Sequence, residues 1–157
     1  RIPDIDILVN DDQTWSEDQF KIKIYHIPGH TSGHVCYYFP KEKMVFTGDT
    51  LFSLGCGRIF EGTHEQMFSS LNKLKNLPPK TKMYCGHEYT LKNSNFCIAN
   101  DSKNLKLKDK IIKVKKKLEN NMPTVPSTLE DEIECNIFLK AKDIKSFSKL
   151  RDLRDNF

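Results

Sequence analysis

The 157-residue sequence has no apolar stretch long enough to span a lipid bilayer, and its N-terminus lacks the basic-then-apolar pattern of a secretory signal. Its five cysteines are an odd number and include no C-x-x-C pair. A disulfide framework is therefore not expected, which favours a reducing compartment and a cytoplasmic protein, with an organelle as the alternative location. Internal repeats and low-complexity linkers are also absent, and the length suits a single domain with a sizeable core.

The net charge of +4 comes largely from the lysines of residues 103–117. A basic stretch can bind nucleic acid or a membrane surface. Here, however, Leu107, Ile111, Val114 and Leu118 recur at helical spacing, and no aromatic residues interleave with the lysines as a nucleic-acid platform requires. We therefore expect the solvated face of an amphipathic helix, with neither nucleic acid nor a membrane as a partner.

Apolar runs rich in β-branched and aromatic residues, bounded by glycine and proline, predict β-strands. Such runs occupy residues 20–27, 35–39, 44–47 and 82–85, and a short alternating run at residues 4–9 predicts an edge strand. The two glycines of residues 55–57 predict a loop. The first part of the chain is therefore expected to be built mainly of strands.

Helix signals dominate the rest of the chain. Thr63 and Gln66 have the spacing of a capping box, and the helix that they open is expected to stop at Pro78. From about Leu91 onward only helices are expected, the last of them from about Ile144. The order indicates an α+β protein whose helical tail either forms a small subdomain or packs back over the loops.

Three of the predicted strands lead into a glycine that is followed at once by a residue of metal-ligand type. These residues are His30, Asp49 and His87. Any one of them alone would more often be structural, but three in the same context favour a site for zinc, iron or manganese. Neighbouring strands would bring their ends together at one edge of a sheet. A carboxylate between two histidines also suits a bridging ligand in a two-metal site, which can generate hydroxide near neutral pH.

Longer motifs resemble a known family. Gly-His-Thr-Ser-Gly-His alone would indicate only the metallo-β-lactamase superfamily, whereas Tyr-Cys-Gly-His-Glu-Tyr-Thr and Thr-Val-Pro-Ser-Thr are more specific. Together the motifs resemble glyoxalase II, hydroxyacylglutathione hydrolase, over about residues 23–157. The segments that carry the resemblance are residues 29–34, 46–52, 55–58, 84–90 and 123–129.

The resemblance implies a metallo-β-lactamase-type β-sandwich with flanking helices, followed by a helical glutathione-binding domain. Residues 1–90 would be the C-terminal part of the first domain, and residues 91–157 would be the second. The implied reaction is hydrolysis of S-D-lactoylglutathione to glutathione and D-lactate by a metal-bound hydroxide. His30 would bind one of two divalent ions and His87 the other, and Asp49 would bridge them as a catalytic residue. These ions would be zinc, with iron or manganese as alternatives, and His34 would orient its loop without touching them.

The substrate implied by the resemblance carries two carboxylates, so its site needs cationic and hydrogen-bonding groups. Arg58, Tyr89, Arg151 and Arg154 match such positions of the family, although the last two would otherwise suit an exposed helix face. Phe60 stands where many members have a tyrosine, and losing that hydroxyl removes about one hydrogen bond, worth ~0.5–1.5 kcal/mol. The implied substrate-binding set is Arg58, Phe60, His87, Tyr89, Arg151 and Arg154.

The family motif T-H-x-H-x-D-H is absent from these 157 residues, and neither His26 nor His64 has its context. Because the motif lies upstream in the family and the chain begins at Arg1, we expect an N-terminal truncation, with natural loss of the motif as the alternative. Three protein ligands hold two metals poorly, so the chain alone is expected to bind metal partially or not at all and to be inactive. It should also expose apolar sheet surface and pair with another copy or with the missing half.

Two other functions stay open from the sequence. One is a persulfide dioxygenase-like enzyme with a single iron, which belongs to the same superfamily. The other is a metal-free, non-catalytic interaction module that keeps the fold without the motif. Nucleic-acid processing is a more distant third.

Overall fold

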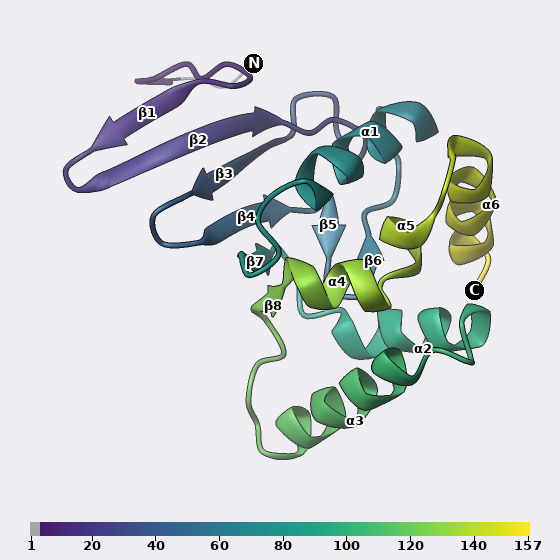
Figure 1. Ribbon diagram of the computed structural model, residues 1–157. Helices are drawn as coiled ribbons and strands as arrows, with labels where there is room; N and C mark the ends of the chain where they lie inside the picture. The colour runs from purple at the N-terminus through teal and green to yellow at the C-terminus, as the bar shows by residue number, and fades with distance from the viewer. Residues whose placement is uncertain (1–3) are drawn as a thin grey trace.

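The computed structural model describes residues 4–157, and a mixed sheet forms its centre (Figure 1). Within these residues the sheet has six strands in the order β1-β2-β3-β4-β7-β8. The strands are β1 (Thr14–Glu17), β2 (Phe20–His26), β3 (Val35–Phe39), β4 (Met44–Gly48), β7 (Lys82–Cys85) and β8 (Ser127–Thr128). Strands β5 (Leu51–Phe52) and β6 (Gly55–Cys56) form a separate two-stranded hairpin.

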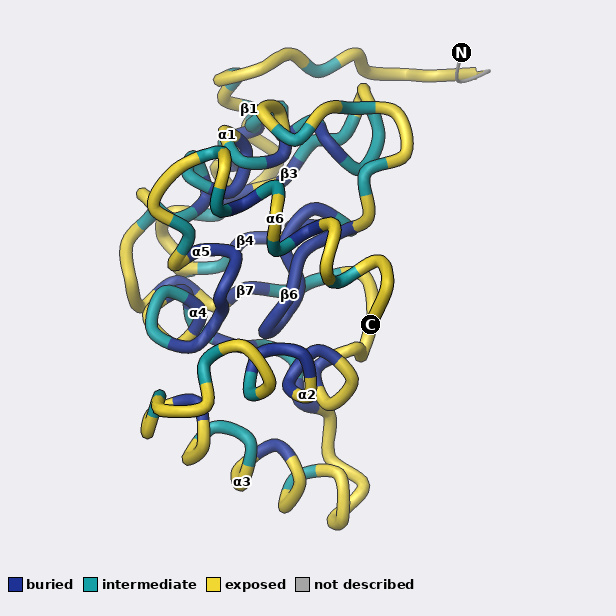
Figure 2. The backbone as a smooth tube through the Cα atoms, turned by 90° about the vertical axis from the view of Figure 1, so that its right-hand side faces the viewer, coloured by how far each residue is buried: buried dark blue, intermediate teal, exposed yellow. Residues whose placement is uncertain are grey.

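The helices pack mainly against one face of this sheet, as Figures 1 and 2 show for α1, α4 and α5. The α+β class expected from the sequence is therefore confirmed. None of the helices in the described part of the chain is long and apolar enough to cross a membrane. The helices are α1 (His64–Lys75), α2 (Thr90–Asn100), α3 (Leu105–Glu119), α4 (Leu129–Cys135), α5 (Ile137–Lys140) and α6 (Ile144–Asp155).

The directions of the strands bring together the loops that carry the candidate ligands His30, Asp49 and His87. Strands β1 to β4 pair antiparallel in turn, and β4 pairs parallel with β7. Strands β2, β4 and β7 therefore run the same way, and their carboxyl ends lie at one edge of the sheet. This is the arrangement that the three strand-glycine-ligand patterns predicted.

Local signals set several element boundaries. The Thr63 hydroxyl accepts from the Gln66 backbone N–H (3.2 Å) and the Gln66 side chain accepts from the Thr63 N–H (2.9 Å), so the predicted capping box begins α1. In α3, Leu107 and Val114 are buried while most of the lysines are exposed, as the amphipathic pattern indicated.

Four expectations about elements were wrong. The tail after Leu91 is not wholly helical, because its short strand β8 adds to the edge of the sheet by pairing with β7. Residues 4–9 form no strand, and the edge strand is instead β1, where Trp15 lies opposite Ile22. Gly55 and Cys56 form strand β6, since a glycine signal marks a reversal of the chain but does not show what pairs around it. Helix α1 ends at Lys75, before the prolines.

The sheet has a second apolar face opposite its helical one, which we call the aromatic face and define by Tyr37, Phe39, Phe46 and Tyr84. Three of these rings are in contact across three strands, with centroids 5.6 Å apart for Phe39–Phe46 and 5.1 Å for Phe46–Tyr84. Phe46 is 40% exposed and Tyr37 38%. The expected exposure of apolar sheet surface is therefore confirmed.

A buried carboxylate fixes the β5–β6 hairpin against the helices. Glu132 in α4 is fully buried and accepts from the Leu54 backbone N–H (2.7 Å) and the Ser53 hydroxyl (3.1 Å). The Lys110 ammonium from α3 also donates to this carboxylate, at 2.6 Å. Leu54 has a positive φ of 59°, so the turn needs such support to hold a non-glycine residue.

Replacing this carboxylate tests how much it contributes to the stability of the fold. We expect Glu132→Gln to lower the free energy of unfolding by about 2 kcal/mol, because it leaves Lys110 with only the more distant Asp131 carboxylate at 3.9 Å. Urea unfolding of the purified chain measures the change, with the exposed Glu130→Gln of the same helix as control. Equal midpoints for the two variants would contradict the assignment.

Candidate metal centre

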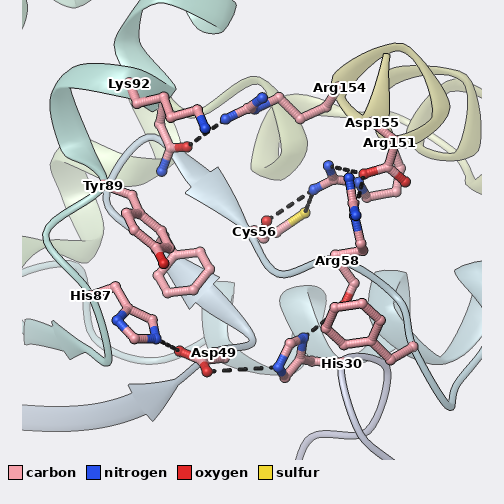
Figure 3. A pocket seen from close by; sticks show the side chains of 13 residues that line it. His30, Asp49, Cys56, Arg58, His87, Tyr89, Lys92, Arg151, Arg154 and Asp155 are labelled. Carbon is pink, nitrogen blue, oxygen red and sulfur yellow. Dashed lines mark hydrogen bonds and ion pairs between the residues drawn. The ribbon is translucent and has the colours of Figure 1, made fainter. Parts of the chain in front are cut away.

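Two imidazoles meet one carboxylate at the edge of the sheet (Figure 3). His30 Nε2 lies 3.6 Å from Asp49 Oδ2, and His87 Nε2 lies 3.5 Å from Asp49 Oδ1. The structure therefore brings the three residues together as the sequence pattern predicted. Each histidine faces a different oxygen of the same carboxylate. Asp49 therefore forms one pair with His30 and a second pair with His87.

Backbone contacts orient His30 and Asp49. His30 Nδ1 lies 2.8 Å from the Arg58 carbonyl oxygen, so Nδ1 carries the proton and the lone pair of Nε2 is turned toward Asp49. The Asp49 backbone N–H donates to His34 Nε2 at 3.2 Å. Burial lowers the pKa of His34, opposed by its hydrogen bond to the Thr47 backbone, and the neutral ring is the form that accepts this N–H. His34 thus holds the Asp49 backbone and is turned away from the shared carboxylate.

The glycines before the ligands are needed for close approach. Gly48 has a positive φ of 51°, and a Cβ there would lie 2.4 Å from His34 Nε2. A Cβ at Gly86 would lie 2.5 Å from Asp49 Oδ1. Both distances are shorter than any real contact, so a side chain at either position would displace the carboxylate or its support.

The donor set fits divalent cations, although it is incomplete. Asp49 Oδ1 is buried and has no hydrogen-bond partner within residues 4–157, a state that a cation would relieve. No group of three or more histidine, cysteine or acidic residues in this range surrounds one common point. Each of two cation positions beside Asp49 would receive one imidazole nitrogen and one carboxylate oxygen, fewer than the three or four ligands that zinc takes.

A pocket of about 520 Å³ opens above this centre. Aromatic rings flank the histidines: Tyr89 stacks on His87 with centroids 4.8 Å apart, and Phe60 lies 5.1 Å from His30. The opposite wall comes from the start of α2 and the end of α6 and is rich in cations (Figure 3). The lining residues are His30, Asp49, Phe52, Cys56, Arg58, Phe60, His87, Tyr89, Lys92, Asn93, Arg151, Arg154 and Asp155.

The arginines of the predicted set all line this pocket, but they differ in their partners. Arg151 is 5% exposed and donates to the Cys56 carbonyl (2.9 Å) and to Asp155 (2.8 Å), so the exposed helix face considered from the sequence is wrong for it. Arg58 pairs with the same Asp155 carboxylate at 3.2 Å. Arg154 donates to the Asn93 side chain at 3.4 Å.

Sequence reasoning missed five lining residues, among them Phe52, Cys56, Lys92 and Asp155. Lys92 carried one usable signal, since it is a cation in the first turn of a helix that has no acidic residue there. Nothing local distinguished Asp155, because its role depends on arginines 97 and 4 residues away in the chain.

Glu88 ties the His87 turn to the connector that precedes β8. Its carboxylate accepts from the backbone N–H groups of Thr124 (2.9 Å) and Val125 (3.0 Å), and from the Thr124 hydroxyl at 2.5 Å. The turn between two pocket residues, His87 and Tyr89, is therefore anchored to a segment 36 residues further along the chain.

The amino-acid sequence of the chain is similar to those of known proteins. The family model "Hydroxyacylglutathione hydrolase C-terminus" matches residues 88–157, and the model "Metallo-beta-lactamase superfamily" matches residues 1–87. A hydroxyacylglutathione hydrolase of Pelagibacter ubique is 64% identical over 157 residues, covering 100% of this chain and 66% of that protein. One from Mesorhizobium japonicum is 40% identical over 171 residues, covering 100% of this chain and 67% of that protein. The chain belongs to the hydroxyacylglutathione hydrolase family.

The family expected from the motifs is thus confirmed, and the chain spans about two thirds of the length of these curated relatives (66% and 67%). Solved structures show the same fold. The "ETHE1 from Myxococcus xanthus" structure matches with a TM-score of 0.68 at 22% identity, over 96% of this chain and 53% of that one. The "BLEG-1 B3 metallo-beta-lactamase" structure matches with a TM-score of 0.60 at 25% identity, over 87% and 49%.

The Glu88 anchor can be tested by hydrogen exchange. We expect Glu88→Gln to speed exchange of the Thr124 and Val125 amides about tenfold, because both N–H groups donate to one carboxylate oxygen, which a neutral amide oxygen replaces with a weaker acceptor. Mass spectrometry of peptides covering these residues measures the rate. The exposed Glu119→Gln at the end of α3 is the control, and equal exchange in both variants would show that Glu88 does not anchor the connector.

Proposed function

We propose that the complete protein containing this chain hydrolyses the thioester of S-D-lactoylglutathione to glutathione and D-lactate. The observation that carries the proposal is Asp49, whose two oxygens each face a different histidine at one end of a pocket with a cationic opposite wall. Family membership supports the same reaction.

The centre would hold two divalent ions, zinc or alternatively iron or manganese. His30 and Asp49 would bind one, and His87 and Asp49 the other. Bound there, the ions supply Lewis-acid polarisation of the thioester carbonyl and lower the pKa of a coordinated water. Because residues 4–157 offer each position only two donor atoms, we expect the chain by itself to bind metal partially or not at all, and to be inactive.

The chain's own residues would bind and orient the substrate. Tyr89 and Phe60 present rings beside the two histidines, which would exclude water from around the thioester. The cationic wall would receive the carboxylates of glutathione. Phe60 supplies no hydroxyl, so binding there would rest on apolar contact. We retain residues 91–157 as the glutathione-binding domain and residues 1–90 as part of the metal-binding one.

The two alternative functions predict different metal binding at these residues. A mononuclear iron enzyme needs one metal position, whereas here the carboxylate presents a separate oxygen to each histidine. A non-catalytic module would neither bind metal nor hydrolyse a thioester as the complete protein. The cytoplasmic location stays a prediction from the cysteine pattern.

Replacement of the shared carboxylate tests the reaction. In the complete gene product we expect Asp49→Asn to lower thioester hydrolysis at least about 100-fold and to lose bound metal, because an amide bridges two cations poorly. Absorbance at the thioester band and elemental analysis measure the two effects. Asp152→Asn, an exposed residue of α6 outside the pocket lining, is the control. Full activity and full metal content in Asp49→Asn would refute the proposal.

The aromatic face generates a prediction about assembly. We expect the isolated 157-residue chain to self-associate, or to pair with the rest of its complete protein, because exposed aromatic rings across three strands favour burial. Light scattering of the chain measures its mass, and Phe46→Lys should shift it toward the monomer. A monomer at all concentrations before the substitution would contradict the expectation.

A further inference from the structure

Part of the connection between β6 and α1, residues 57–62, lies directly against the loop that carries His30. This segment has no regular secondary structure, so contacts with its neighbours decide where it lies. The Phe60 backbone N–H donates to the His30 carbonyl oxygen at 3.2 Å. The Gly62 N–H donates to the Gly29 carbonyl oxygen, also at 3.2 Å, and a Cβ atom at Gly62 would lie only 2.6 Å from the Gly29 Cα atom. The segment and the loop are therefore in close contact.

This segment also supplies the hydrogen-bond partner of the His30 ring. The Arg58 carbonyl oxygen lies 2.8 Å from His30 Nδ1 (Figure 3). The contact keeps the ring proton on Nδ1 and leaves Nε2, the nitrogen that faces Asp49, as the one with a lone pair. The orientation of this candidate ligand therefore depends on where the segment lies relative to the His30 loop.

One side chain of the segment, that of Glu61, ties it to the loop. Glu61 Oε2 accepts from the Ser32 backbone N–H at 2.8 Å and from the Ser32 hydroxyl at 2.9 Å. On the side of the sheet, the Ser32 carbonyl oxygen lies 2.7 Å from Nε2 of His26, the last residue of β2. The N–H, hydroxyl and carbonyl groups of Ser32 thus each have a partner, and this residue fixes the loop between the sheet and the segment.

Neither Glu61 nor Ser32 lines the pocket, and both residues are exposed. Any role at the metal centre must therefore act through the His30 loop and not through contact with a substrate. Hydrogen bonds to a carboxylate are stronger than those to a neutral group. Partners that orient a ligating histidine typically change metal affinity by about 10- to 100-fold when they are removed.

We propose that Glu61 is a positioning residue for the metal position that His30 and Asp49 would form. By holding Ser32, it keeps the segment against the His30 loop, and the Arg58 carbonyl oxygen then directs His30 Nε2 toward Asp49. The inference rests on the proposed function, which places a cation at this position.

The effect of Glu61 is confined to one of the two metal positions. His87 lies in a different turn, which Glu88 anchors to the connector before β8. Both positions would share Asp49, so a general loosening of the centre would weaken both of them. A loss at the His30 position alone is therefore the signature of positioning by Glu61.

Zinc binding by the complete protein tests this signature. We expect Glu61→Ala to weaken zinc binding about tenfold at the position beside His30 and to leave the position beside His87 within about twofold. Titration against a competing chelator measures the two affinities, and anomalous peaks from crystals grown at limiting zinc assign them. Glu61→Gln should retain most of the affinity, because its amide oxygen can still accept from both Ser32 donors. Glu119→Ala, at an exposed glutamate of α3, is the matched control for net charge.

Three results would overturn the proposal. Equal weakening at both metal positions would show a general loss of structure. Equal losses in Glu61→Ala and Glu61→Gln would show that the negative charge matters and the hydrogen bonds to Ser32 do not. Zinc binding in Glu61→Ala that equals that of Glu119→Ala would show that Glu61 has no part in the metal centre.

A measurement on the metal-free complete protein keeps the inference separate from the proposed function. The His30 Nδ1 proton should give a protected NMR signal, and Glu61→Ala should speed its exchange with solvent at least about fivefold. With excess zinc, kcat and KM of Glu61→Ala should return to within about twofold of the original values, because mass action fills a weakened site. A protein that shows the zinc and NMR effects but hydrolyses no thioester would refute the proposed function and support this inference. A thioesterase that shows neither effect would refute the inference alone.

Discussion

The candidate metal centre depends on one carboxylate, that of Asp49, which lies between two imidazoles. Asp49 follows β4, and the two histidines follow β2 and β7, so the carboxylate and its partners meet only because those strands run in the same direction. A buried Asp49 oxygen without a hydrogen bond is costly in a protein that binds no cation there. The chain nevertheless surrounds this group with glycines that allow nothing larger, which indicates a site built for charge.

The helices complete the pocket whose base lies at the edge of the sheet. Glu132 fixes the β5–β6 hairpin, and that hairpin contributes Phe52 and Cys56 to the pocket. Arg151 of helix α6, the yellow helix in Figure 1, donates a hydrogen bond to the Cys56 carbonyl of the same hairpin. The helical tail therefore packs back over the loops, one of the two arrangements left open by the sequence, and it supplies arginines to the pocket beside the candidate ligands.

The sequence predicted those parts of the site that local pattern determines. A strand, a glycine and a ligand repeat three times, and the capping box at Thr63 is read directly from four residues. The contacts between residues that lie far apart in the chain could not be predicted from such local patterns. The division of the arginines into two that share Asp155 and one that does not is decided by how α6 docks. The run at residues 4–9 has strand-like alternation, yet the sheet edge is taken by β1, since pairing depends on the partner strand as much as on local preference.

The central claim is that Asp49, with His30 facing one of its oxygens and His87 the other, would hold two divalent cations together with these histidines. Anomalous diffraction from crystals of the complete, metal-loaded protein tests it most directly. The account predicts two anomalous peaks, one between His30 Nε2 and Asp49 Oδ2 and the other between His87 Nε2 and Asp49 Oδ1. A single peak remote from the Asp49 carboxylate would contradict it.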